Sequence, residues 1–271
     1  PDALRICIMS GSFVQRGEPA IFSKFDRARW AILGGADIVI ELPTLYSTGS
    51  AQLFGTGAIR MVKALAIDAL SFGSETADLN ALIDIAKRMD CESTQEQLRT
   101  YINEGMSYGT AFRKALHTEI LNTPNALLGL EYIRAGLAYN PKLEYIPILR
   151  TSNHHEETIT DGLPSGTALR QLITSAGDLS SQCITSTGDL SSKCVTSTGN
   201  LASQLQSAIP SSIASDMTQV IENGNYLNYN RYHDMVHSLS RRTTPKELEK
   251  FGDFNEGIEH LWSKAAQQFS W

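Results

Sequence analysis

The segment from Ile6 to Pro43 constrains the fold most, because two apolar runs enclose a polar turn and a helical pattern. The first run, Leu4 to Met9, breaks at Ser10-Gly11-Ser12, and the second, Ala36 to Leu42, stops at the proline. Continuous apolar runs of this length predict parallel strands that are covered on both faces. The segment is typical of half of a nucleotide-binding α/β unit.

Helical signals lie between and after these runs. Ser23 and Asp26 have the spacing of a capping box with the shorter acid, and Gly34-Gly35 is a stop signal. Helical periodicity over Ser50 to Leu65 precedes a third predicted strand, Asp68 to Phe72. This alternation predicts right-handed crossovers and a parallel sheet.

The rest of the chain is mostly helical in pattern. We predict, in order, a charged helical layer at 77–121, a helix at 124–139, a fourth strand at 143–149, a helix at 168–173 and a helical end from 209. The predicted fold class is therefore α/β, a Rossmann-like parallel sheet with an additional mainly helical C-terminal region.

Three near-copies of an 11-residue unit occupy 174–206. The period would place Leu179, Leu190 and Leu201 on one helix face, but the glycines weaken a helix. We favour a tandem duplication in a tolerant surface connection, with a binding repeat as the alternative. The predicted parts are a nucleotide-binding α/β domain at 1–173, an insertion or linker at 174–206 and a helical region at 207–271.

Composition limits the function classes. A net charge of −6 argues against nonspecific coating of DNA or RNA, because phosphates need a cationic surface. No apolar run approaches membrane length and no signal-peptide pattern is present, so we expect a cytoplasmic protein without a membrane partner. We interpret the four cysteines as reduced thiols. His154-His155 lacks metal-ligand spacing, so we expect no protein metal site.

The first strand end offers candidate phosphate or substrate contacts. Ser10 and Gly11 form a turn whose amides can approach a phosphate or carboxylate, although such a turn needs glycine for conformational reasons alone. Lys24 and Arg27 share a helix face from which both can reach a polyphosphate. A solvated helix face is the alternative for this pair.

Three further candidates lie at the other strand ends, where open parallel sheets bind ligands. Gly73 closes the third strand and permits a base or ribose to stack on the main chain. Asn125 can cap a helix or bind an adenine edge, and Glu75 can cap the next helix. Arg150 ends a buried strand and is expected to face the ligand crevice.

The run from Pro164 to Arg170 is the sharpest local motif. Ser165 and Thr167 can present hydroxyls and amides at a helix N-terminus, and Arg170 follows one turn later with reach to phosphates. Helix capping explains the two hydroxyl residues but not the arginine.

Cations interleaved with histidines follow several tyrosines near the end of the chain. Arg231, Arg241, Arg242 and Lys246 suit an RNA backbone, as single-stranded loops require. A charged helical surface is the alternative explanation.

Together these motifs resemble the tRNA(Met) cytidine acetate ligase family, HIGH-type nucleotidyltransferase-like proteins of bacteria. The resemblance covers about residues 4–173 and returns at 255–259. It rests on MSGSFVQRGEPAIFSKFDRARWAILGGADIVIELP, SAQLFGTGAI, LSFGSE, TPNALLGLEYIRA, YIPILR, SGTALRQ and NEGIE.

The resemblance implies activation of acetate with ATP and Mg²⁺ to acetyl-adenylate, then acetylation of the wobble cytidine of elongator tRNA(Met). By motif matching, the implied ATP contacts are Gly73, Asn125, Arg150 and Thr151. Ser165, Thr167 and Arg170 match the phosphate-side signature of the superfamily.

The family's first strand and His-x-Gly-His element should precede Leu4, so we assign no catalytic residue. We expect the chain as printed to bind ATP poorly and not to catalyse adenylation. The alternatives are another small-molecule nucleotidyltransferase and a noncatalytic nucleotide- or RNA-binding fragment.

Overall fold

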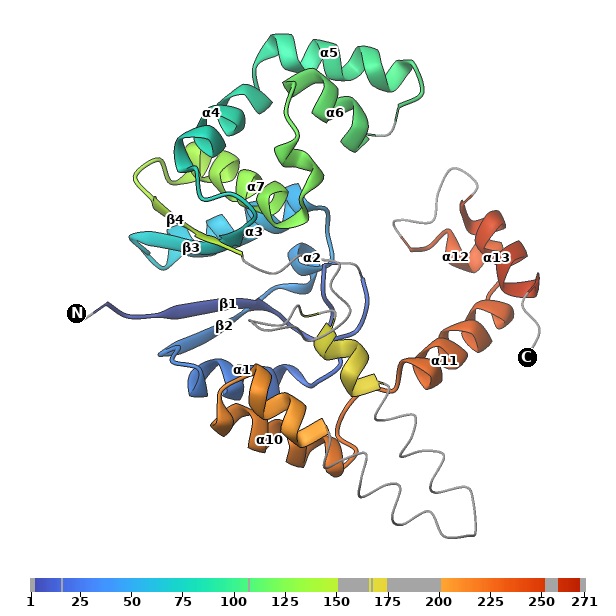
Figure 1. The fold of residues 1–271 in the computed structure, drawn as a ribbon. Helices are drawn as coiled ribbons and strands as arrows, with labels where there is room; N and C mark the ends of the chain where they lie inside the picture. The colour runs from blue at the N-terminus through green and yellow to red at the C-terminus, as the bar shows by residue number, and fades with distance from the viewer. Residues whose placement is uncertain are drawn as a thin grey trace, which may run out of the picture.

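The computed structural model describes residues 3–15, 17–106, 108–150, 166, 168–174, 201–251 and 258–268. Its first part is an α/β unit, and its last part is helical, with α10 beside α1 and α11 to α13 extending away from the unit (Figure 1). None of the helices in these ranges has the length and hydropathy needed to cross a membrane.

The α/β unit follows the predicted order of elements. It contains β1 (Ile6–Ser10), α1 (Lys24–Leu33), β2 (Ile38–Leu42), α2 (Thr44–Ser47), α3 (Ala51–Ala64), β3 (Ala69–Ser74), α4 (Leu79–Met89), α5 (Glu92–Asn103), α6 (Tyr108–Leu116), the 3₁₀ turn η1 (Ile120–Asn122), α7 (Pro124–Tyr139) and β4 (Glu144–Leu149). The helical part contains α10 (Ser211–Glu222), α11 (Tyr229–Arg242), α12 (Pro245–Leu248) and α13 (Ile258–Gln268). Residues 168–174 and 201–208 are also helical.

Local signals account well for the helix ends. Ser23 is the N-cap of α1 and accepts a hydrogen bond from the Asp26 amide at 3.1 Å, while Gly34 is the C-cap. Ser50 caps α3 in the same way, accepting from the Leu53 amide. These side chains satisfy amides that have no partner inside the helix.

The strands are parallel, as predicted, but within the described residues they form two sheets rather than one. β1 pairs with β2, with Ile6 opposite Ile38, and β3 pairs with β4, with Ala69 opposite Glu144. Within these residues β1 and β3 are not paired with each other, although residues of both line one cleft.

The predicted burial of the first two strands on both faces is also wrong in the described structure. All five residues of β1 are only half-buried, and Ile38 of β2 is 41% exposed.

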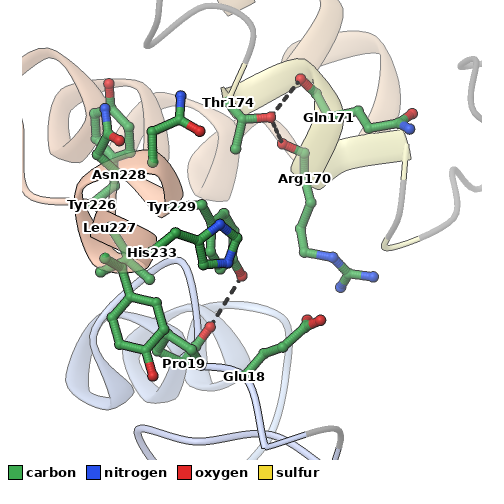
Figure 2. Close-up of a pocket in the computed structure, with 12 residues that line it drawn as sticks. Glu18, Pro19, Arg170, Gln171, Thr174, Tyr226, Leu227, Asn228, Tyr229 and His233 are labelled. Atoms are coloured by element: carbon green, nitrogen blue, oxygen red, sulfur yellow. Dashed lines mark hydrogen bonds between the residues drawn. The ribbon is translucent and has the colours of Figure 1, made fainter. Parts of the chain in front are cut away.

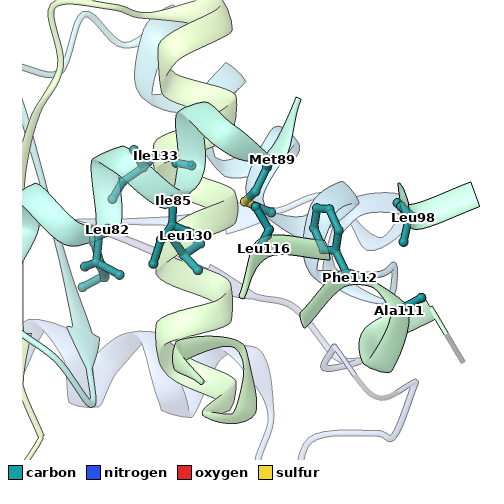
Figure 3. Packing of buried hydrophobic residues seen from close by; sticks show 11 residues of the cluster. Leu82, Ile85, Met89, Leu98, Ala111, Phe112, Leu116, Leu130 and Ile133 are labelled. Atoms are coloured by element: carbon teal, nitrogen blue, oxygen red, sulfur yellow. The ribbon is translucent and has the colours of Figure 1, made fainter. Parts of the chain in front are cut away.

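The largest hydrophobic core lies between α7, β3 and the helical layer α4 to α6 (Figure 3). The α7 helix approaches β3 closely at Gly129, where an added Cβ would lie 2.5 Å from the Phe72 ring. The largest fully buried side chains of this core are Leu82, Met89, Leu116, Leu130 and Ile133. This packing fixes α7, and with it the helix end that faces the cleft.

A second core joins α1 to α10 and the helical residues before it. Trp30, Leu201 and Leu205 are buried there. The last repeat therefore contributes to a core, although we predicted a surface connection for the repeats as a whole. Leu179 and Leu190 lie outside the described residues, and the division of the chain at 173 and 206 stays a prediction.

Candidate functional site

The main cleft opens between β1 and β3 and has a volume of 960 Å³. Its lining includes three residues that we predicted as ATP contacts: Gly73, Asn125 and Arg150. An added Cβ at Gly73 would lie 3.5 Å from the aliphatic part of the Arg150 side chain. Glycine at this position therefore leaves the space beside that side chain open. The structure therefore brings these three residues from β3, α7 and the end of β4 to one site.

Glu75 holds the cleft end of α7. One carboxylate oxygen of Glu75 accepts from the Asn125 side-chain amide at 2.7 Å, and the other accepts from the Ala126 backbone amide at 2.8 Å. Burial favours the neutral acid, but these hydrogen bonds outweigh burial and lower the Glu75 pKa. The carboxylate is thus charged at neutral pH and fixes the orientation of Asn125.

This contact corrects one alternative from the sequence. Glu75 does not cap the next helix; it caps α7, fifty residues away, while Asp78 caps α4. Because Asn125 donates to Glu75, its carbonyl oxygen is the group left to accept from a ligand amine. Sequence spacing could not reveal this pair, since the two residues meet only when β3 and α7 pack together.

Arg150 brings positive charge to the same cleft. Its backbone amide donates to the Ser74 carbonyl at 2.9 Å, which extends the pairing of β3 with β4 by one residue. Its buried Nε has no hydrogen-bond partner among the described residues. A buried donor without a partner costs stability and calls for an explanation such as a ligand oxygen.

The candidates at the other strand end have contacts within the protein. Arg27 donates to the carbonyls of Ser10 and Gly11, and Lys24 forms an ion pair with Glu41 at 2.6 Å. Partial burial lowers the Arg27 pKa, and the Glu41 charge partly offsets this effect. The four predicted residues therefore do gather at one strand end, and their contact with a phosphate or substrate stays a prediction.

The Ser/Thr-rich motif is only partly described. Thr151, Ser165 and Thr167 lie outside the described residues. Arg170 lines a different pocket from the cleft, together with Glu18 and Tyr229 (Figure 2). Among the described residues, the two pockets share no lining residue.

The predicted RNA-facing cations lie on α11 and α12. Arg231 and Arg242 are exposed and eleven residues apart, so they lie about 20° from each other around the helix axis. Lys246 is also exposed, whereas Arg241 donates to the Ala266 carbonyl at 2.9 Å and holds α13 against α11. Arg231 and Arg242 thus form an outward cationic face, and Arg241 has a packing role.

The part of the chain that the structure describes contains no group of three His, Cys, Asp or Glu side chains suited to a metal ion. Phosphates and water are common ligands of Mg²⁺ in nucleotide sites.

Parallel βα units that place Gly73, Asn125 and Arg150 around one cleft have the architecture in which α/β proteins bind nucleotides. The chain belongs to the HIGH Nucleotidyl Transferase family, whose family model matches residues 1–270. This finding confirms the family resemblance and the fold class that the sequence motifs indicated.

Individual relatives carry a more specific name. A tRNA(Met) cytidine acetate ligase from Fusobacterium nucleatum subsp. nucleatum is 38% identical over 177 residues, 65% of this chain and 44% of the relative. The Alkaliphilus metalliredigens protein of the same name is 31% identical and spans 97% of this chain and 62% of the relative.

Solved structures agree with this relationship. A crystal structure of Thermotoga maritima TmcAL without ligand matches with a TM-score of 0.82 and 25% identity, over 98% of this chain and 61% of that one. A second form, bound with alpha-thio ATP, matches with a TM-score of 0.77 and 25% identity, over 98% of this chain and 60% of that one. The chain spans about 60% of these solved chains and less than two thirds of the first curated relatives.

Proposed function

We propose that the protein is an ATP-dependent acetate ligase that acetylates N4 of the wobble cytidine in elongator tRNA(Met). The observation that carries the proposal is the convergence of Gly73, Asn125 and Arg150 in one cleft. The names of the relatives and the ATP-analogue complex of the Thermotoga protein support it. We place this activity in the cytoplasm, with tRNA rather than DNA or a membrane as the partner.

The reaction needs two displacements. An acetate oxygen attacks the α-phosphorus of ATP and pyrophosphate leaves, giving acetyl-adenylate. The cytidine amine then attacks the acetyl carbonyl carbon, the bond from that carbon to AMP breaks, and the amine loses a proton. Proteins promote such steps mainly by positioning the reactants and stabilising phosphate charge.

The cleft residues fit the adenosine and phosphate groups of ATP. Gly73 leaves room for a base or ribose beside the main chain, and Asn125 can accept from the adenine amine. Arg150 offers an unsatisfied buried donor and a positive charge. Thr151, Ser165 and Thr167 remain proposed ATP contacts, and Mg²⁺ bound by ATP would neutralise phosphate charge.

The tRNA-facing role belongs to the helical part in this proposal. Arg231, Arg242 and Lys246 supply exposed positive charge for phosphates. Arg241 contributes through the α11–α13 contact that supports this surface. Lys24 and Arg27, with Ser10 and Gly11, remain the proposed phosphate or substrate end of the neighbouring strands.

The direct test is acetate-dependent conversion of ATP to AMP and pyrophosphate, with and without tRNA(Met). We would compare the chain as printed with one extended upstream by an apolar strand that ends in His-x-Gly-His. Activity only in the extended chain supports the ligase and the requirement for that element. ATP binding without turnover in both would favour a noncatalytic binding protein, and turnover with a small phosphate ester another nucleotidyltransferase.

Arg150→Gln, introduced into the extended chain, tests the cleft itself. Loss of a charge-assisted contact to phosphate, worth about 1.5–3 kcal/mol, should weaken ATP binding roughly 10- to 150-fold. Arg99→Gln makes the same change at an exposed position on α5 and should leave ATP affinity unchanged. Equal ATP affinity of both variants in calorimetric titration would contradict the proposed site.

A further inference from the structure

An ion pair lies at each end of the β1–β2 pair. At the amino ends of the strands, Arg5 pairs with Asp37 at 3.3 Å. At the carboxyl ends, Lys24 of α1 pairs with Glu41 of β2 at 2.6 Å. Of the two, the Lys24 pair lies at the edge where open parallel sheets bind ligands. Its acidic member, Glu41, has been given no role above.

The Glu41 carboxylate is seated against the Ser10-Gly11 turn. An added Cβ at Gly11 would overlap one carboxylate oxygen of Glu41, so glycine leaves the room that this side chain needs. The other carboxylate oxygen accepts from the Lys24 ammonium. An exposed ion pair on its own contributes little to stability. Close packing on the turn gives this carboxylate, and the ammonium bonded to it, a defined position.

A second cation holds the same turn. The Arg27 guanidinium donates to the Ser10 carbonyl at 3.0 Å and also to the Gly11 carbonyl. Its buried Nε has no hydrogen-bond partner among the described residues. Burial lowers the pKa of Arg27 and the Glu41 charge raises it, so the carboxylate acts on this cation as well. One carboxylate therefore balances two cations around the end of β1.

This arrangement has opposite consequences for binding and for reaction. A ligand oxyanion that approaches Lys24 must share the ammonium with Glu41, and the two negative charges repel each other. The same carboxylate restricts the ammonium to one position, and a cation stabilises developing phosphate charge best when it is held in place beforehand. A carboxylate at this position should therefore lower anion affinity and raise the rate of phosphate chemistry.

We propose that Glu41 is a positioning residue that acts through Lys24 at the carboxyl end of β1. It fixes the ammonium beside the turn, and a ligand anion has to share that ammonium with it. The inference rests on the proposed function, because it takes Lys24 and Arg27 as the phosphate end of the site. It adds a residue that acts on a reactant only through another side chain, and it predicts a variant with tighter anion binding and slower turnover.

The first test measures the binding of inorganic pyrophosphate, the leaving group of the proposed reaction, by calorimetric titration of the extended chain. Glu41→Gln keeps the size of the side chain and removes its charge, so it should bind pyrophosphate roughly 2- to 10-fold tighter at low salt. This gain should shrink as ionic strength rises, because the charges are partly exposed. Lys24→Gln should bind pyrophosphate more weakly than the unsubstituted chain.

The second test measures turnover of the same proteins. Glu41→Gln should lower kcat for acetate-dependent release of pyrophosphate roughly 10- to 100-fold, because a displacement of about 1 Å in a charged contact has an effect of this order. In a Lys24→Gln background the same substitution should lower kcat by no more than about twofold, since residues in contact are not additive when one acts through the other. A purely structural role would lower kcat equally in both backgrounds.

Asp37→Asn is the matched control, because it removes the charge of the ion pair at the other end of the same two strands. It should leave pyrophosphate affinity and kcat unchanged. Unchanged or weaker pyrophosphate binding by Glu41→Gln would overturn the proposal. An equal loss of kcat with and without Lys24 would overturn it as well.

The binding test needs no turnover and so separates the two proposals. Tighter pyrophosphate binding by Glu41→Gln in an extended chain that does not convert ATP would sustain the shared ammonium and count against the ligase. Acetate-dependent turnover with a pyrophosphate affinity that does not respond to Glu41→Gln would sustain the ligase and count against the role of Glu41.

Discussion

At the scale of single residues, the cleft depends on one carboxylate that joins two elements. The Glu75 carboxylate caps the N-terminus of α7 and also orients the Asn125 side chain. The local sequence suggests that Asn125 either caps a helix or binds adenine. In the structure the Glu75 carboxylate caps α7 instead, so the carbonyl oxygen of Asn125 remains available to a ligand in the cleft.

Removal of this carboxylate should have two separable effects. Glu75→Ala should lower the free energy of unfolding by about 1 kcal/mol, as expected for a lost N-terminal cap. It should also weaken ATP binding several-fold, because Asn125 loses its orienting partner. Thermal unfolding and calorimetric titration with ATP would measure the two effects.

Asp78→Ala provides the control, because Asp78 caps α4 by accepting from the Ala81 amide at 3.0 Å. It should cost a similar amount of stability and leave ATP affinity unchanged. A parallel loss of ATP affinity in both variants would mean that Glu75 acts only on helix stability.

At the scale of elements, close packing of α7 on β3 sets the position of the cleft. The helix carries Gly129 against the Phe72 ring, where an added Cβ would lie at 2.5 Å. Gly129→Ala should therefore destabilise the protein by roughly 1–3 kcal/mol through overpacking, despite the better helix propensity of alanine. Urea unfolding of the variant measures this change.

Gly109→Ala in α6 is the control that separates the effect of packing on stability from the effect of helix propensity. An added Cβ at Gly109 meets no atom of the described residues within 4 Å, so the variant should be as stable as the original chain or slightly more stable. If Gly129→Ala behaved in the same way, the close approach of α7 to β3 would not be a constraint.

The sequence predicted the individual helices and strands better than it predicted which of them pair or pack together. Capping at Ser23 and the Pro124 start of α7 are local signals, and both are confirmed. The separation of β1 from β3 could not be predicted, because strand pairing depends on long-range packing rather than on apolar runs. The contacts of Arg27 and Glu75 escaped prediction for the same reason, since their partners lie in other elements.

At the scale of the whole molecule, a charged group adds to the apolar core that joins α10 to the α/β unit. Asp216 accepts from Arg29 at 2.7 Å and also from the Trp30 indole, across 186 residues of sequence. The hydrogen bonds from Arg29 and then Trp30 lower the Asp216 pKa below its ordinary value of 3.8. This contact connects α1, near the start of the chain, to α10, the helix that precedes α11.

Asp216→Asn should lower the free energy of unfolding at pH 7 by about 1 kcal/mol, because the variant loses charge-assisted bonds at a partly exposed site. A lowered pKa in the folded state means that the carboxylate contributes fully above its ordinary value and loses this contribution as the pH falls through the folded-state pKa. The stability difference between the two proteins should therefore shrink below about pH 4. Asp84→Asn is the control: it removes an exposed ion pair with Arg88 at 3.7 Å and should change stability little. If the effect of Asp216→Asn did not depend on pH, the Asp216 contact would stabilise the protein through packing rather than through charge.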